Sequence, residues 1–270
     1  MTTLEVRDVV KEYHLRSGFR STTLTAVDHV SFTLEPGRTV ALVGQSGSGK
    51  STIAKLLMQL ERPTSGEIAV DGEPVQRRGP GLRSYRKEVQ MVFQDPFASL
   101  NPYHTIEHHL ERPIRLHHRG LSTDEVRDRV RSLLERVRLD ATDDFARRRP
   151  HELSGGQRQR VAIARALAPE PGILVADEPV SMLDVSIRLG VLNLLASLQR
   201  EENLGVLYIT HDLATARHFS DEILVMYRGQ IVERGAADEV ILNPQHEYTR
   251  LLAEAAPDPE RRLRELSATA

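Results

Sequence analysis

The chain has 270 residues, enough for one large domain with a full hydrophobic core, and its 36 Lys and Arg nearly balance 38 Asp and Glu. A net charge of −2 provides no general attraction for nucleic acid, so any anion must be bound locally. The absence of cysteine excludes disulfide bonds and thiolate-ligated metal or iron–sulfur centres.

The sequence contains no segment with the features of an export signal or a membrane span. Its first residues, MTTLEVRD, lack a basic region followed by an apolar one. No apolar run approaches the ~18 residues that a spanning helix needs. We therefore expect a cytoplasmic chain that acts at a membrane only through partners that span it.

The first third of the chain predicts strands followed by a helix. Residues 27–35, VDHVSFTLE, alternate apolar and polar side chains, which predicts a half-buried strand, and the earlier LEVRDVV stretch is its expected partner. The run 39–44, TVALVG, is continuously apolar and predicts a strand covered on both faces. After a glycine-rich loop, KSTIAKLLMQL has helical periodicity.

The rest of the chain repeats the buried-strand pattern. Residues 173–176 and 206–210 each follow a helical stretch, which predicts parallel strands joined by crossover helices. Residues 223–235 predict a hairpin that turns at Arg228-Gly229. Between Tyr103 and Pro150 the chain is charged and helical, so we expect an inserted helical lobe there.

The glycine-rich loop carries the strongest functional signal. It reads Gly44-Gln45-Ser46-Gly47-Ser48-Gly49-Lys50-Ser51 and matches the pattern G-x-x-x-x-G-K-[ST] between a strand and a helix. Its N–H groups can converge on the β- and γ-phosphates of a nucleotide, Lys50 can reach the same oxygens, and the Ser51 hydroxyl can ligate Mg²⁺. Nucleotide binding is therefore favoured over a purely structural glycine turn.

Polar side chains follow three of the predicted strands. Asp177 and Glu178 end the run ILVADE, Gln94 ends VQMVFQ, and His211 follows VLYIT. The carboxyl ends of parallel strands border the ligand crevice. We expect Asp177 to hold Mg²⁺ through water, Glu178 to deprotonate the attacking water, Gln94 to contact metal and water, and His211 to contact the γ-phosphate. The alternative for each is an ordinary loop or helix-capping residue.

One more segment predicts an anion site without offering a local partner. Ser154, Gly155, Gly156 and Gln157 open a helix, and free N–H groups at a helix N-terminus attract anions. Taken alone, the segment favours the simpler interpretation, in which Ser154 is only an N-cap and the glycines only a loop.

Together these motifs resemble, in chain order, those of the ATP-binding cassette (ABC) ATPases. They are Gly44–Ser51 (Walker A), Gln94 (Q-loop), Leu153–Gln157 (signature), Asp177-Glu178 (Walker B), Ser181–Asp184 (D-loop) and His211 (H-loop). The resemblance implies an α/β P-loop NTPase fold with a mostly parallel, RecA-like core. It also implies an N-terminal antiparallel β subdomain and an inserted helical subdomain at about 103–168. All of this lies within one ATPase domain, residues 1–255, and 256–270 form a polar tail.

The resemblance also supplies roles for several residues. Two cassettes dimerise head to tail, so Ser154, Gly155, Gly156 and Gln157 contact ATP held by the partner's Walker A loop, and Asp184 belongs to the same interface. ATP and Mg²⁺ are the implied ligands, with Ser51, Gln94 and Asp177 at the metal and Thr52 beside the phosphates. Tyr13 is expected to stack on adenine, with Phe19 in the long 14–26 segment as the alternative.

Longer stretches resemble one branch of the family, the ATPase subunits of oligopeptide and dipeptide importers, which also includes nickel and glutathione importers. They include FQDPFASLNPYHTI, ADEPVSMLDVSI and NPQHEYTRLLAEAAP. The implied partners are a second cassette of the same or a related kind, two transmembrane permeases that dock on the helical lobe and the segment after Gln94, and, indirectly, a solute-binding protein. Departures are Glu247 where proline is usual, Met182 where alanine is usual, and the missing cysteine cluster of some members.

Two alternatives remain at this level. A non-transport ABC ATPase acting on DNA or ribosomes is disfavoured by the short segment between Ser51 and Leu153 and by the single cassette, and we expect no nucleic-acid partner. A regulatory module that binds ATP without hydrolysis is disfavoured by the intact motifs. The histidine-rich stretch HTIEHHLERPIRLHH is interpreted as surface histidines on a helix interrupted by Pro102 and Pro113, with no transition metal.

Overall fold

A computed structural model describes residues 2–17 and 20–255 of the protein. The strands are β1 (Leu4–Ser17), β2 (Arg20–Leu34), β3 (Thr39–Val43), β4 (Ser65–Val70), β5 (Glu73–Pro74), β6 (Val89–Val92), β7 (Ile173–Asp177), β8 (Gly205–Thr210), β9 (Glu222–Tyr227) and β10 (Gln230–Ala236). The helices are α1 (Lys50–Leu57), α2 (Gly79–Glu88), α3 (Pro96–Ser99), α4 (Ile106–His117), α5 (Thr123–Arg136), α6 (Asp143–Ala146), α7 (Gly155–Leu167), α8 (Val185–Glu201), α9 (Leu213–Phe219), α10 (Ala237–Leu242) and α11 (Glu247–Ala255), with a 3₁₀ turn at Pro150–Glu152.

The strands form two sheets. The larger has the order β10-β9-β3-β8-β7-β6, with parallel pairing from β9 to β6 and an antiparallel edge strand β10. The smaller is antiparallel, with the order β2-β1-β4-β5. This arrangement agrees with the expected α/β fold, and the smaller sheet corresponds to the expected N-terminal antiparallel β subdomain. The sequence patterns predicted β1, β2, β3 and β6 to β10, whereas β4 and β5 were not predicted.

Both faces of the larger sheet are buried, as the continuous apolar runs predict. Val40 and Leu42 of β3 pack in a core with α1 and the smaller sheet. Ala41 and Val43, which alternate with them, pack in a second core with α8, α9 and the helices around α7. The loop between β3 and α1 therefore starts from a strand that is fixed on both sides.

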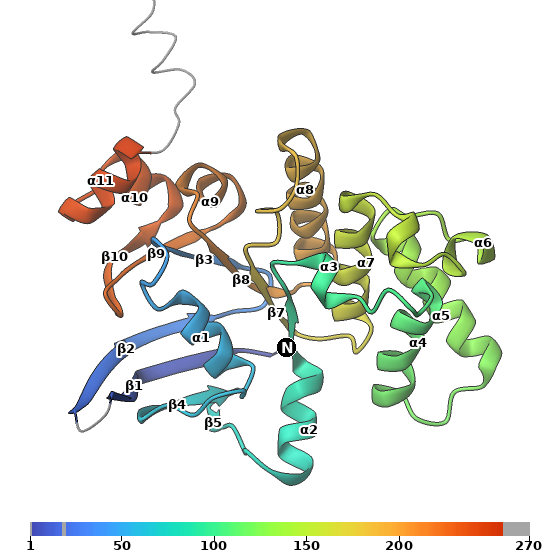
Figure 1. Ribbon diagram of the computed structural model, residues 1–270, viewed down its shortest axis with the longest axis horizontal. Helices are drawn as coiled ribbons and strands as arrows, with labels where there is room; N and C mark the ends of the chain where they lie inside the picture. Colours follow the sequence, from blue (N-terminus) through green and yellow to red (C-terminus); the bar gives the residue numbers. More distant parts are fainter. Residues whose placement is uncertain (1, 18–19, 256–270) are drawn as a thin grey trace, which may run out of the picture.

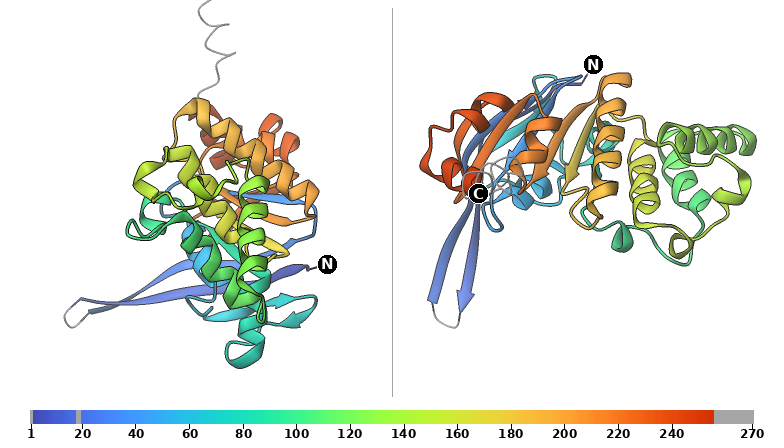
Figure 2. Two further views of the ribbon diagram at one scale, coloured as in Figure 1. Left: turned by 90° about the vertical axis from the view of Figure 1, so that its right-hand side faces the viewer. Right: turned by 90° about the horizontal axis from the view of Figure 1, so that it is seen from above.

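The remaining helices and the first hairpin extend from this layered centre. Figure 1 shows α4, α5, α6 and α7 gathered on one side of the molecule, with α10 and α11 on the other. Figure 2 shows the β1–β2 hairpin projecting from the body. Among the described residues, every helix is too short or too polar to cross a lipid bilayer.

One sequence-based expectation about α4 is wrong. Pro113 was expected to interrupt a helix, but α4 continues through it from Ile106 to His117. The helix is anchored on one buried face by Ile106, Leu110 and Ile114. Apolar burial over a whole helix face outweighs the lost N–H donor of a single proline, which costs roughly 3 kcal/mol.

Candidate functional site

The loop between β3 and α1 is shaped by close backbone approaches. A Cβ added to Gly44 would lie 2.3 Å from the Met226 carbonyl oxygen on β9. Gly49, the N-cap of α1, has φ +115°, and a Cβ there would lie 2.4 Å from the Ala26 carbonyl oxygen. Glycine is therefore required at both ends of the loop, because any side chain would push it off β9 and β2.

Lys50 is a buried cation at the centre of this loop. It is 6% exposed, and its Nζ donates to the carbonyl oxygens of Gly44 at 2.6 Å and Gln45 at 2.9 Å. Burial lowers the pKa of Lys50, while the charges of Glu178 and Asp177 oppose that change. Within the described part of the chain Lys50 forms no ion pair at contact distance. A buried ammonium group beside the free N–H groups of a helix start is suited to bind an anion.

A cavity of about 900 Å³ opens in front of Lys50. The expected ligand-contacting residues that line it are Tyr13, Gln45, Ser46, Gly47, Gly49, Lys50, Ser51, Thr52, Gln94, Glu178 and His211. Gly44 and Ser48 belong to the same loop without lining the cavity. Residues from five separate parts of the chain, at Tyr13, the glycine loop, Gln94, Glu178 and His211, thus meet in one volume large enough for a nucleotide.

Two polar side chains that follow strands meet at the carboxylate of a third, Glu178. Gln94, in the loop after β6, donates from Nε2 to Oε2 of Glu178 at 3.0 Å. His211, directly after β8, places Nδ1 3.0 Å from Oε1 of Glu178. The carboxylate therefore lies between an amide and an imidazole at the carboxyl edge of the parallel sheet, where both can orient it.

Asp177 lies next to Glu178 but faces a different space. Burial raises the pKa of Asp177, the charge of Glu178 adds to that effect, and Lys50 opposes it. Its side chain borders a neighbouring groove rather than the cavity in front of Lys50. Asp177 therefore does not line the cavity at Lys50 but lies within electrostatic range of Lys50.

Tyr13 is fixed by charged neighbours that no sequence motif predicts. Its hydroxyl donates to Glu61 at 2.5 Å, and Lys11 Nζ lies 4.9 Å from the ring centroid. Burial and the bond to Glu61 raise the pKa of Tyr13, and the same bond lowers the pKa of Glu61. No local sequence pattern indicates this contact, because Tyr13 and Glu61 are 48 residues apart. Phe19, the alternative to Tyr13, lies outside the described residues.

The segment Ser154–Gln157 lies away from the Lys50 cavity of the same chain. Ser154 caps α7 reciprocally with Gln157: its hydroxyl accepts from the Gln157 N–H at 3.2 Å, and Gln157 Oε1 accepts from the Ser154 N–H at 2.9 Å. Gly155 and Gly156 form the first turn of α7, and Asp184 is the exposed residue before α8. None of Ser154–Gln157 lines the cavity at Lys50, and Figure 1 shows α7 apart from α1.

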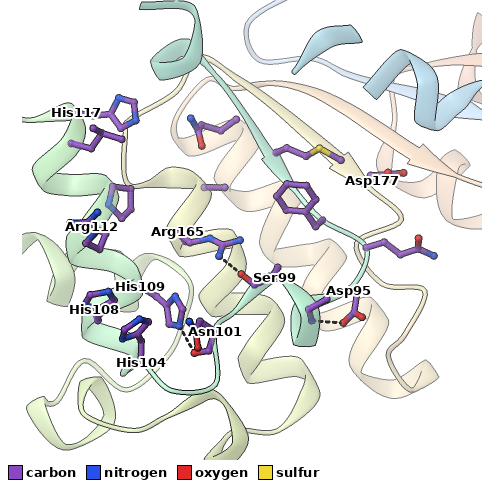
Figure 3. Close-up of a pocket in the computed structure, with 18 of the residues that line it drawn as sticks. Asp95, Ser99, Asn101, His104, His108, His109, Arg112, His117, Arg165 and Asp177 are labelled. Atoms are coloured by element: carbon purple, nitrogen blue, oxygen red, sulfur yellow. Dashed lines mark hydrogen bonds between the residues drawn. The ribbon is translucent and has the colours of Figure 1, made fainter. Parts of the chain in front are cut away.

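A second hollow, a groove of about 1250 Å³, lies between the segment after β6, α4 and α7. Figure 3 shows Asp95 and Ser99 on that segment, His104, His108, His109 and Arg112 at α4, and Arg165 from α7. Arg165 donates to the Ser99 carbonyl, and Arg158 lies 4.2 Å over the Phe97 ring. These contacts attach the segment that begins at Gln94 to α7, the helix that Ser154 caps.

One histidine of this groove is buried, although all of them were expected on the surface. His104 is exposed, and its ring stacks on His108 with centroids 4.0 Å apart. His109, by contrast, is buried, and its Nε2 lies 3.0 Å from the Asn101 carbonyl oxygen. The interpretation of all of them as surface histidines is therefore wrong for His109, because it packs on the inner face of α4.

Comparison with known proteins agrees with this geometry. Residues 27–181 match the family model described as ABC transporter. The chain belongs to the ABC transporter family. It is therefore an ABC ATPase cassette that binds ATP, and the expected resemblance is confirmed.

Two relatives illustrate the branch. The oligopeptide transport ATP-binding protein OppF of Escherichia coli (strain K12) is 45% identical over 263 residues, which cover 95% of this cassette and 78% of OppF. The glutathione import ATP-binding protein GsiA of Salmonella typhimurium is 47% identical over 264 residues, 96% of this cassette. The cassette spans 42% of the length of GsiA.

A solved structure confirms the fold and provides a dimeric comparison. The cassette MJ0796, described as a dimer in a post-hydrolysis state bound to ADP and Pi, is 32% identical with a TM-score of 0.75. The match covers 87% of this cassette and 98% of MJ0796.

Proposed function

We propose that this cassette is the ATP-hydrolysing subunit of an importer for peptides or a related small solute. The observation that carries the proposal is the meeting of Lys50, Gln94, Glu178 and His211 around one cavity at the carboxyl edge of the sheet. The relatives OppF and GsiA, named for oligopeptide transport and glutathione import, support the choice of solute.

In this proposal the glycine loop binds the phosphates. The residues in contact with ATP are Tyr13, Gly44, Gln45, Ser46, Gly47, Ser48, Gly49, Lys50, Ser51 and Thr52. Two N–H groups of Lys50 donate to the Gly44 and Gln45 carbonyls, and the third donates to a phosphate oxygen. Tyr13, fixed by Glu61, stacks on adenine. Ser51, Gln94 and Asp177 supply oxygen ligands suited to Mg²⁺, with Asp177 acting through water. When bound, Mg²⁺ neutralises charge on the phosphates.

Glu178 is the proposed general base. It takes a proton from a water molecule as the water oxygen attacks the γ-phosphorus, and the bond from that phosphorus to ADP breaks. Gln94 and His211 hold the carboxylate in place from both of its oxygens. His211 also contacts the γ-phosphate once ATP is bound. Residues Ser154, Gly155, Gly156 and Gln157 complete the site of a second cassette, with Asp184 at the shared interface.

The groove beside α4 supports the assignment of the partners. We assign the groove at α4 and the segment after Gln94 to two transmembrane permeases, which hold the cassette on the cytoplasmic face of the membrane. The groove bears Arg112 and Arg165, and the contacts of Ser99 and Phe97 with α7 connect it to the signature helix. A solute-binding protein acts indirectly, and no nucleic acid takes part.

The test is affinity purification of the tagged chain from gently solubilised native membranes, with sequencing of all co-purifying proteins. Two multi-spanning proteins, with a second cassette of the same or a related sequence, are expected. An Arg112→Glu variant serves as the matched control, because it reverses one charge in the groove away from the nucleotide cavity, and it is expected to lose these partners. Recovery of ribosomes or DNA in their place would contradict the importer function while leaving ATP hydrolysis intact.

A further inference from the structure

Tyr248 of α11 contacts the phosphate-binding loop from the far end of the chain. Its hydroxyl accepts a hydrogen bond from the backbone N–H of Gln45 at 2.9 Å, across a separation of 203 residues. Tyr248 is 7% exposed, so its hydroxyl is held in a largely dry environment. Figure 1 shows α11 on the side of the larger sheet where β9 and β10 lie.

The hydrogen bond to Tyr248 and one hydrogen bond of Lys50 are made by the same peptide unit. The Gly44 carbonyl and the Gln45 N–H belong to the same peptide bond, and a peptide unit is planar. Its carbonyl oxygen accepts from Lys50 Nζ at 2.6 Å, while its N–H donates to Tyr248 at 2.9 Å. Because the two groups point in opposite directions in one plane, fixing the N–H also fixes the direction in which the carbonyl meets Lys50.

Tyr248 is itself firmly placed. Glu233 of β10 accepts from the N–H groups of Gln245 at 2.7 Å and His246 at 2.9 Å, which orders the turn before α11. The Tyr248 ring packs on Tyr227 of β9, with centroids 4.2 Å apart. Within the described residues the Tyr227 hydroxyl makes no hydrogen bond. The two rings therefore share one environment, but only one hydroxyl reaches the loop.

We propose that Tyr248 is a positioning residue for Lys50, acting through the Gly44–Gln45 peptide plane. The C-terminal segment thereby sets the affinity of the loop for nucleotide, without touching the nucleotide itself. The inference rests on the proposed function in one respect, namely that Lys50 binds the phosphates.

The experiment compares Tyr248→Phe with Tyr227→Phe in the full chain. Each variant removes one hydroxyl and keeps the contact between the two rings. Tyr248→Phe is expected to weaken equilibrium binding of MgATP about fivefold, the effect of one neutral hydrogen bond. It is also expected to speed hydrogen exchange at the Gln45 amide. Tyr227→Phe should leave both unchanged. Equal effects of the two variants, or no effect of Tyr248→Phe, would overturn the proposal.

A second variant removes the donor instead of the acceptor. Gln45→Pro has no N–H at this position, so adding Tyr248→Phe in that background should produce no further loss of MgATP affinity. A full additional fivefold loss would mean that Tyr248 acts by another route.

A Lys50→Ala variant distinguishes failure of the proposed phosphate site from failure of the role given to Tyr248. If Lys50→Ala leaves MgATP binding intact, the proposed phosphate site is wrong. If it abolishes binding while Tyr248→Phe does nothing, only this inference fails.

Discussion

Glu178 is held in a backbone conformation that L-residues rarely adopt. Its φ is +43°, in the left-handed region, which costs on the order of 1 kcal/mol for a residue with a side chain. The Glu178 carbonyl oxygen accepts from both the N–H and the hydroxyl of Ser181, each at 3.1 Å. These bonds stabilise a sharp turn after β7, so the carboxylate points toward Gln94 and His211 instead of continuing the strand.

Replacing this carboxylate by an amide tests the proposed general base. In Glu178→Gln we expect ATP turnover to fall at least ~100-fold, because an amide cannot accept the proton of the attacking water. MgATP affinity should stay within about twofold, since Lys50 and the glycine loop are unchanged. Steady-state phosphate release and equilibrium binding measure the two quantities. Glu73→Gln, an exposed change on β5, is the control, and turnover near the wild-type rate in Glu178→Gln would remove Glu178 as the base.

Among individual residues, the sequence predicts the functional side chains that follow buried strands. It does not predict the side chains that reach the site from elements distant in the chain. Gln94, Glu178 and His211 follow apolar runs whose ends are sharp, so their meeting follows from parallel pairing alone. Glu61 and Tyr248 follow no such rule. Their contacts with Tyr13 and Gln45 depend on how separate elements pack, which no local periodicity encodes.

Among the elements, α4 shows how tertiary packing overrides a local signal. Thr105 caps its first turn, three buried aliphatic side chains fix one face, and the helix passes through Pro113. Proline predicts a break because it lacks an N–H donor, and this loss is visible in the sequence. The core that the helix covers is not visible there, and it keeps the helix continuous. The same core explains why His109, one position after the partly exposed His108, is buried.

The burial of His109 makes the stability of this helix sensitive to pH. Burial lowers the pKa of His109 in the folded protein, with smaller contributions from the charges of Arg165, His108 and His104, and the contact with the Asn101 carbonyl opposes them. The neutral form is therefore favoured in the folded state. The resulting stability is fully present above the unfolded-state pKa of about 6.5 and is lost as the pH falls below that value.

We expect His109→Gln to reduce the loss of unfolding free energy between about pH 7.5 and 5.5. Some loss should remain, because burial also lowers the pKa of His117. Urea unfolding at the two pH values measures the change, and His218→Gln, an exposed change on α9, is the control. A pH dependence in His109→Gln as steep as in the wild type would contradict this account.

For the whole molecule, the separation of α7 from the cavity at Lys50 requires a second cassette to complete the proposed site. The structure supplies a way to test this without damaging the fold. A Cβ added to Gly155 would meet only the Leu183 side chain, at an ordinary contact distance of 3.5 Å. An aspartate in the first turn of a helix also interacts favourably with the helix dipole.

Gly155→Asp is therefore expected to fold normally and to bind MgATP, with a free energy of unfolding within about 0.5 kcal/mol of the wild type. It should fail to dimerise, because its carboxylate would face the γ-phosphate held by the partner. Sedimentation with and without ATP, in a Glu178→Gln background, measures the dimer. Gly155→Asn, similar in size but uncharged, separates repulsion from crowding. An ATP-dependent dimer of Gly155→Asp would refute binding across the interface.

The order of strands in the larger sheet has a consequence for how this protein is made. Strand β3 lies between β8 and β9, so both of its neighbours are synthesised more than 160 residues later. As the chain leaves the ribosome, the glycine loop that follows β3 has no sheet to support it until residues 205–227 have emerged. Its hydrogen bond to Tyr248 forms later still. During synthesis, ATP consequently cannot help residues 1–204 to fold and can stabilise the cassette only after β8 and β9 have emerged.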